Sequence, residues 1–162
     1  MNLSALKSPP FRSYVVSLHL ALNGFWAQRV IIGWLAWEMT GSAGFVGLVA
    51  FLNFFPTLFV SPLFGVFADR IDVRKGSILS YALAGILSAL FAGLCIFGSP
   101  TPVLLALFSF VTGVISSANH PMRMSLTPRL APAGDLPSVV AITSLNFNMS
   151  RLTGPAIGGI LI

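Results

Sequence analysis

Two long uncharged apolar runs, joined by a short charged connection, constrain this chain more than any other feature of its sequence. Residues 45–67 and 77–97 contain no charged side chain. The chain has nine basic and four acidic residues, thirteen in all, and five of them lie in the connection: Asp69, Arg70, Asp72, Arg74 and Lys75. A helix needs about 20 mostly apolar residues to cross the hydrocarbon of a bilayer. The pattern therefore predicts two membrane-spanning helices with a polar connection between them.

The composition extends this prediction to the whole chain. Hydrophobic residues make up 56% and charged residues 8%, against roughly 25% charged in an ordinary soluble domain. Too little polar surface is available to cover a soluble core. We expect an all-α membrane protein whose residues 1–162 contain five transmembrane helices, over 14–37, 45–67, 77–97, 103–119 and 139–162. Polar residues weaken the fifth prediction: Asn146, Asn148, Ser150 and Arg151.

The basic residues predict an orientation. Seven of the nine fall before the first span or in the second-to-third and fourth-to-fifth connections, which alternation places on one side: Lys7, Arg12, Arg70, Arg74, Lys75, Arg123 and Arg129. The positive-inside rule makes that side cytoplasmic. We therefore expect a multi-pass protein of the bacterial plasma (inner) membrane with a cytoplasmic N-terminus. The net charge of +5 then reflects topology and attraction to the lipid bilayer, not nucleic-acid binding.

Sequence motifs for catalysis are missing. The sequence has no His-Glu-x-x-His, no Gly-x-Ser-x-Gly and no phosphate-binding glycine loop. Its single Cys95 offers neither a disulfide nor a metal pair. We expect no enzymatic activity and no bound cofactor or metal.

Polar groups inside the spans are the candidates for a substrate cavity, because polar groups are costly to expose to lipid. These candidates are His19, Asn23, Trp26, Arg29 and Arg151. A His or Asn on a membrane helix is more often a hydrogen-bonding partner of another helix than a ligand. Arg151 has no acidic residue in any predicted span to neutralise it, so its partner is substrate, backbone, lipid or another part of the protein. If it faces the cavity, it favours anionic substrates.

Other polar residues have simpler explanations. Asn53 and Pro56 suggest a kink in the second span. Asn119 and His120 suggest a solvated cap at the inner end of the fourth.

The charged connection resembles the loop between spans two and three of the major facilitator superfamily. Gly65, Asp69, Arg70 and Arg74 match that signature in register, and Lys75 adds a second positive charge. Asp72 stands where a turn glycine is expected. The resemblance implies a gating role for the loop, with Asp69 in a charge latch that breaks when the two halves of a transporter rock.

A second stretch resembles the signature that exporters of this superfamily carry in span five. It comprises Gly154, Pro155, Gly158 and Gly159, with Ser150 in place of an earlier glycine. Ser150, Gly154 and Gly158 form a smooth strip for helix packing. Segments in spans one and two, and Pro121 to Pro128, are similar to a bacterial branch that contains siderophore (enterobactin-type) and macrolide exporters.

This resemblance implies five helices of an N-terminal six-helix half, and export of a drug-like or siderophore-like small molecule by alternating access. It implies coupling to an ion gradient, with a proton as the expected ion, although Ser109 stands where many proton-coupled exporters carry arginine. The C-terminal half is then missing, and we expect the strip to lack a partner in five helices. Two alternatives stay open: an inactive membrane fragment, or a small non-transporting assembly or regulatory subunit.

Overall fold

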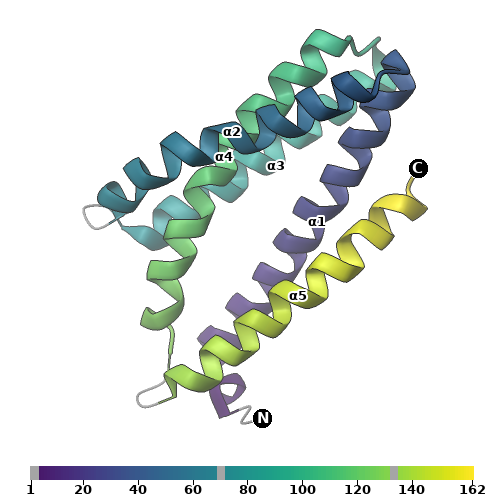
Figure 1. Cartoon of the computed structure of the whole chain (residues 1–162). Coiled ribbons are helices and arrows are strands. Elements are labelled where there is room, and N and C mark those ends of the chain that lie inside the picture. The colour runs from purple at the N-terminus through teal and green to yellow at the C-terminus, as the bar shows by residue number, and fades with distance from the viewer. Residues whose placement is uncertain (1–3, 69–71, 132–134) are drawn as a thin grey trace. The chain divides into compact units, whose positions relative to one another are not determined.

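Helices account for nearly all of the chain. The computed structural model describes residues 4–68, 72–131 and 135–162, without the side chains of residues 64–68 and 120. A short 3-10 helix, η1 (Ser4–Lys7), precedes five α-helices: α1 (Pro9–Thr40), α2 (Ala43–Ala68), α3 (Val73–Phe97), α4 (Pro102–Arg129) and α5 (Leu136–Ile160) (Figure 1). These ranges contain no strand. The predicted all-α fold class is confirmed.

The helices extend beyond the apolar runs that predicted them. α1 begins at Pro9 and α4 continues to Arg129, past the expected boundaries at residues 14 and 119. Backbone hydrogen bonding continues through polar residues at the ends of a span, so apolarity marks the hydrocarbon depth and not the helix length. Within the described residues, four helices are long and apolar enough to cross a membrane: α1, α3, α4 and residues 43–63 of α2. α5 has 25 residues but carries the polar side chains noted above.

Local residues explain where α1 ends and where α3 begins. Gly41 follows α1 with φ of 60°, the left-handed conformation that glycine tolerates, and its N–H donates to the Trp37 carbonyl at 2.7 Å. At the start of α3, Asp72 Oδ1 accepts from the backbone N–H groups of Arg74 and Lys75 at 3.0 and 3.2 Å. Asp72 is thus a helix N-cap.

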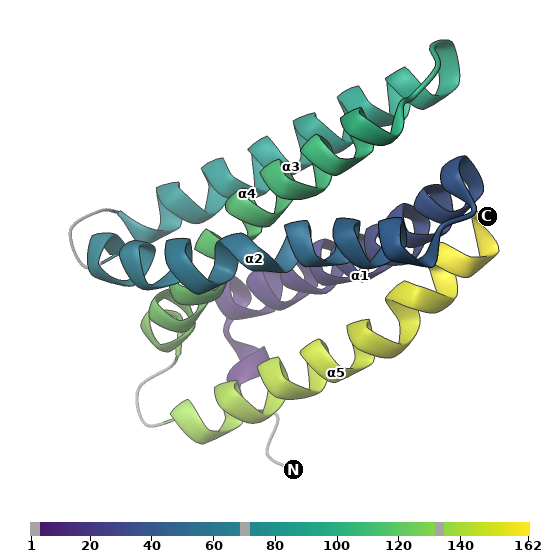
Figure 2. The ribbon, with the colours of Figure 1, turned by 45° about the horizontal axis from the view of Figure 1, so that its top comes forward.

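One compact unit comprises the described residues of 1–31 and 126–162. α1 and α5 run side by side in it, as both views show (Figures 1 and 2). Its buried apolar cluster joins Ala5, Phe11, Val139 and Ile142. The Tyr14 hydroxyl lies 3.0 Å from Thr127 Oγ1.

The second unit comprises residues 32–125, with a buried cluster of Ile32, Ala36, Val49, Leu105 and Phe108. α3 and α4 lie side by side in it (Figure 2). Asn53 of α2 and Ser80 of α3 each form a hydrogen bond to α4 in it.

One sequence-based interpretation in this unit was wrong, and another stays a prediction. Asn53 Nδ2 donates to the Ser109 carbonyl at 3.3 Å and to Thr112 Oγ1 at 3.2 Å, so Asn53 links α2 to α4. The kink expected at Asn53 and Pro56 stays a prediction. Asn119 is no cap, because α4 continues past it and its Oδ1 accepts from Ser80 of α3. The side chain of His120 lies outside the described residues.

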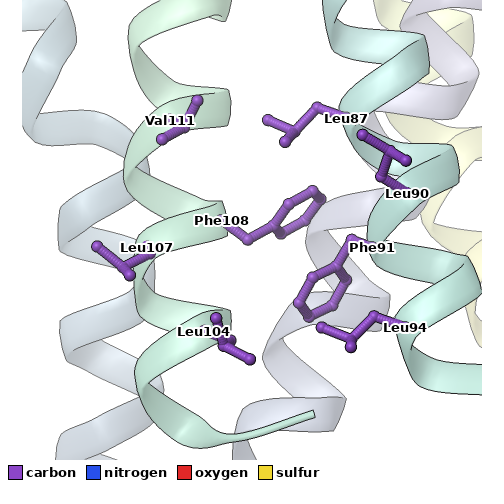
Figure 3. Close-up of a pocket in the computed structure, with 8 residues that line it drawn as sticks. All are labelled: Leu87, Leu90, Phe91, Leu94, Leu104, Leu107, Phe108 and Val111. Carbon is purple, nitrogen blue, oxygen red and sulfur yellow. The ribbon is translucent and has the colours of Figure 1, made fainter. Parts of the chain in front are cut away.

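α3 and α4 form an apolar groove. It is lined by Leu87, Leu90, Phe91, Leu94, Leu104, Leu107, Phe108 and Val111 (Figure 3). Phe91 and Phe108 meet across it with stacked rings, 4.2 Å between centroids. No polar side chain lines it, so it offers hydrophobic contact without the directional groups that fix a ligand's orientation.

Candidate functional site in the α1–α5 seam

The polar side chains of α1 and α5 meet in one hydrogen-bonded seam. The α1–α5 seam is defined here by six residues: His19, Asn23, Trp26, Asn146, Ser150 and Thr153. His19 Nδ1 lies 2.6 Å from Asn146 Oδ1 and 3.1 Å from Ser150 Oγ. Thr153 Oγ1 donates to Asn23 Oδ1 at 2.6 Å, and Asn23 Nδ2 donates to Ser150 Oγ at 3.3 Å. The imidazole, amide and hydroxyl groups of the seam are therefore paired between the two helices.

Small residues of α5 allow this approach. Ser150 has no exposed surface, and Gly154 and Gly158 are buried. A Cβ built on Gly154 would lie 2.5 Å from Trp26 Cβ, and one on Gly158 would lie 2.8 Å from the Ala27 carbonyl oxygen. Both contacts are too short for any side chain. The expectation that this strip lacks a partner in five helices was therefore wrong, because α1 covers it.

Two arginines lie against the same indole in this unit. The Arg151 guanidinium carbon is 5.8 Å from the centroid of the Trp26 ring, and that of Arg29 is 5.5 Å away. Arg29 also lies 5.3 Å from the Phe25 ring, and Phe147 of α5 meets Trp26 edge to face at 6.1 Å. Such cation–π contacts contribute about 0.5–1 kcal/mol at exposed sites and more when desolvated. Aromatic rings thus hold two cations near one end of the seam.

The Trp26 indole has an unused donor. Among the described residues, no acceptor lies within hydrogen-bond distance of its buried Nε1. Arg151 is exposed, and its guanidinium contacts the Trp26 ring. An indole N–H and a guanidinium are both donors only, so this end of the seam is suited to a ligand with acceptor oxygens.

All five predicted cavity residues fall in this unit, in two roles. His19 and Asn23 join α1 to α5 by hydrogen bonds, while Trp26, Arg29 and Arg151 form the aromatic and cationic cluster.

The predicted loop residues are only partly described. Gly65 lies in the helical backbone of α2, and Arg74 and Lys75 form the first turn of α3. Asp69 and Arg70 lie outside the described residues. In the predicted exporter motif, Pro155 lies within α5. A Cβ built on Gly159 would meet no atom within 4 Å, unlike one on Gly154 or Gly158.

Sequence reasoning missed three contributors on α5: Asn146, Phe147 and Thr153. In the sequence, Asn146 only interrupts the apolar pattern of the fifth span. The spacing of Asn146, Ser150 and Thr153, at intervals of four and three, places them on one helical face. That polar face, opposite the polar face of α1, was the available signal.

Comparisons with known proteins identify the family of this chain. A family model of the major facilitator superfamily, described as a transmembrane secretion effector, matches residues 1–162. The enterobactin exporter of Shigella boydii is 31% identical over 169 residues, covering 100% of this chain and 39% of the exporter. The staphyloferrin A transporter of Staphylococcus aureus is 25% identical over 149 residues, covering 90% of this chain and 37% of the transporter.

The chain thus spans well under half the length of these relatives. No solved structure shows a significant match to it.

Proposed function

Because this chain belongs to the transmembrane secretion effector family of the major facilitator superfamily, we propose that it contributes five helices to an exporter of small anionic molecules. The exporter works in the bacterial plasma membrane and moves its substrate by alternating access, without converting it chemically. The enterobactin exporter and the staphyloferrin A transporter support a siderophore-like substrate. The basic residues before the first span and in the second-to-third and fourth-to-fifth connections support a cytoplasmic N-terminus.

One observation carries this proposal: two guanidinium groups and an unpartnered indole N–H converge in the unit built by α1 and α5. A cation in a span is costly without a partner, and such residues mark substrate or ion pathways. Carboxylate, phenolate or carbonyl oxygens would accept from these donors, and an aromatic substrate ring would pack on the indole. Arg151 is the proposed substrate contact, because its side chain is exposed and its contact with α1, over the face of the Trp26 ring, uses none of its N–H donors.

Alternating access needs helices that pack closely and still move. The strip of Ser150, Gly154 and Gly158 presents little side-chain volume to α1. Smooth surfaces of this kind let membrane helices approach closely, and rocking of repeats around a midplane site is the general mechanism of such transporters. Pro155 leaves one backbone carbonyl of α5 without its helical partner, which favours a bend beside the strip.

The test is efflux of a catecholate or carboxylate siderophore from cells that express the complete natural protein with substitutions at Arg151. Arg151→Ala is expected to lower efflux at least about tenfold, which corresponds to roughly 1.4 kcal/mol. Arg151→Lys is expected to keep part of it, because the charge stays while the planar stacking surface is lost.

Arg12→Ala is the matched control, since it removes the same charge from an exposed position near the start of α1. All three variants are expected at wild-type levels in the membrane fraction. Wild-type efflux by Arg151→Ala would show that Arg151 is not a substrate contact.

A further inference from the structure

The side-chain amide of Asn53 is held by two groups of α4. Its Nδ2 donates to the Ser109 carbonyl at 3.3 Å and to Thr112 Oγ1 at 3.2 Å. A carbonyl oxygen only accepts hydrogen bonds, so the nitrogen of this amide is the atom that faces α4. Val49 and Leu105 lie one turn before Asn53 and Ser109 and belong to one buried cluster. α2 and α4 therefore run in the same direction along this contact.

The backbones of the two helices meet at the same place. A Cβ built on Gly113 would lie 2.5 Å from the Asn53 carbonyl oxygen and 3.0 Å from the Asn53 carbonyl carbon. Gly113 thus allows the close approach, but it has no side chain that could hold the helices there. We call this contact the α2–α4 crossing and define it by four residues: Asn53, Ser109, Thr112 and Gly113. The Asn53 amide is a directional group at the crossing.

The α1–α5 seam has the same construction. The sequence Ser-x-x-Thr-Gly occurs twice in the chain, at residues 109–113 in α4 and at residues 150–154 in α5. In the seam, Asn23 Nδ2 donates to Ser150 Oγ, and Asn23 Oδ1 accepts from Thr153 Oγ1. A Cβ built on Gly154 would lie 3.0 Å from the Asn23 carbonyl oxygen. In both units, one asparagine therefore binds the serine and threonine of this sequence and lies against its glycine.

From this repeated geometry we propose that Asn53 is a positioning residue, which fixes the axial register of α4 against α2. A slip of one residue would move the acceptors on α4 by ~1.5 Å. Both hydrogen bonds of the amide, at 3.3 and 3.2 Å, would then exceed hydrogen-bond distance. The part that Asn53 plays in export rests on the proposed function, whereas its effect on the register does not.

α2 is a helix that needs such a directional contact. Lipid tails are as apolar as leucine, so apolar packing alone gives a membrane helix little preference for one register. α2 also contains Pro56 and Pro62, and each proline removes one backbone hydrogen bond from the helix. Asn53 lies three residues before Pro56 and ties α2 to α4 beside this weakened turn.

Unfolding equilibria test whether Asn53 and Thr112 are partners, whatever the protein transports. In the complete natural protein in detergent micelles, Thr112→Val should lower the ratio of folded to unfolded protein about threefold, as expected for one hydrogen bond between membrane helices. In an Asn53→Ala background this threefold effect should disappear, because the bond is already absent.

Thr143→Val is the matched control for this cycle. Thr143 Oγ1 donates to the carbonyls of Val139 and Val140 in its own helix, so the effect of Thr143→Val should be the same with Asn53 and with Asn53→Ala. An equal effect of Thr112→Val in the two backgrounds would contradict the pairing of Asn53 with α4.

Distances between spin labels test the register itself. Ala43 lies ten residues before Asn53, Met124 lies eleven residues after Gly113, and both positions are exposed. Labels on Ala43→Cys and Met124→Cys, in a Cys95→Ala background in lipid nanodiscs, are therefore separated by about 30 Å along the two helices at ~1.5 Å per residue. Because this separation lies along the helix axes, a slip of α4 against α2 changes it directly.

We expect one narrow distance distribution with Asn53 present. In Asn53→Ala we expect a second or shifted distance that differs by about 1.5 Å or more, the rise of one residue. Asn148→Ala is the matched control, because Asn148 Nδ2 donates to the Ser144 carbonyl of its own helix, and it should keep the original distance. An unchanged distribution in Asn53→Ala would overturn the proposal.

Efflux of a catecholate siderophore by the complete natural protein tests the role in export. Asn53→Ala should lower the maximal rate at least about threefold, the effect of one such hydrogen bond. It should leave the half-saturating substrate concentration unchanged, because the amide hydrogens of Asn53 bind α4. Asn148→Ala should change neither quantity.

The efflux results separate this inference from the proposed function. A wild-type maximal rate in Asn53→Ala would show that the register is not needed for export and would overturn the positioning role. Absence of efflux from the wild-type protein would refute the export function, and the unfolding and distance results would still decide whether Asn53 fixes the register.

Discussion

Replacing Gly154 with alanine tests the closest contact between α1 and α5. The added Cβ would lie 2.5 Å from Trp26 Cβ and 3.0 Å from the Asn23 carbonyl oxygen. Carbon atoms pack at about 3.5–4.0 Å, so the helices must separate by roughly 1 Å. The hydrogen bond from Asn23 to Ser150, already 3.3 Å long, would then exceed hydrogen-bond distance, and the bond from Thr153 to Asn23 would weaken.

The cost can be estimated from these two effects. Overpacking a close contact costs about 1–3 kcal/mol, and a hydrogen bond between membrane helices contributes about 0.6 kcal/mol on average. Alanine in place of glycine returns about 0.5–1 kcal/mol of helix propensity. We therefore expect Gly154→Ala to lower the free energy of unfolding by about 1–3 kcal/mol.

The assay is equilibrium unfolding by denaturant of the complete natural protein in detergent micelles, followed by Trp fluorescence. Gly159→Ala is the matched control, because it lies on the same helix with no atom within 4 Å of the added Cβ. It should be neutral or slightly stabilising. If Gly154→Ala is as stable as Gly159→Ala, the close α1–α5 contact does not exist in the folded protein.

Two further predictions concern the helix ends. Pro128 and Ser99 are both exposed, and each can be replaced by a single cysteine in a Cys95→Ala background. An impermeant maleimide should react with Pro128→Cys from the cytoplasm and with Ser99→Cys from outside. Labelling of Pro128→Cys in intact cells would show that the orientation is the opposite one. Asp72→Ala removes the acceptor of two backbone N–H groups and should lower the free energy of unfolding by about 1 kcal/mol. Asp72→Ser should keep most of that stability, because serine also caps helices. Equal stability of Asp72→Ala and the wild type would rule out the cap.

The number and order of the helices could be predicted from the sequence, because a helix buried in lipid needs a long apolar run. The few charged residues of the chain lie mostly between these runs, so the runs are easy to separate. The sequence did not predict the ends of the helices. Residues 120–129 continue α4 although polar and charged residues interrupt the apolar pattern there, since a helix persists where water can solvate its side chains.

The polar residues of the candidate site could be predicted within each helix, but their contacts between helices could not. Helical spacing placed His19, Asn23 and Trp26 together, and the absence of acidic residues singled out Arg151. Which helix faces which is set by contacts across about 130 residues of chain, and no local pattern specifies them. For that reason the aromatic partner of Arg151 and the acceptors on Asn146 and Asn23 emerged only from the structure. Asp72 was recognised as a turn residue, but its capping role depends on backbone geometry.

The polarity of α5 has a consequence for how the protein is made. Taken alone, α5 carries the unpaired amide of Asn146 and the guanidinium of Arg151 into hydrocarbon, and it is not among the helices apolar enough to be identified as spans. The Asn146 amide finds its partners on α1, which is synthesised more than a hundred residues earlier. α1 must therefore remain at the insertion machinery, or return to it, while α5 enters the bilayer. A ribosome that stalls before Asn146 leaves His19 and Asn23 without α5 partners, a state that membrane quality control can recognise.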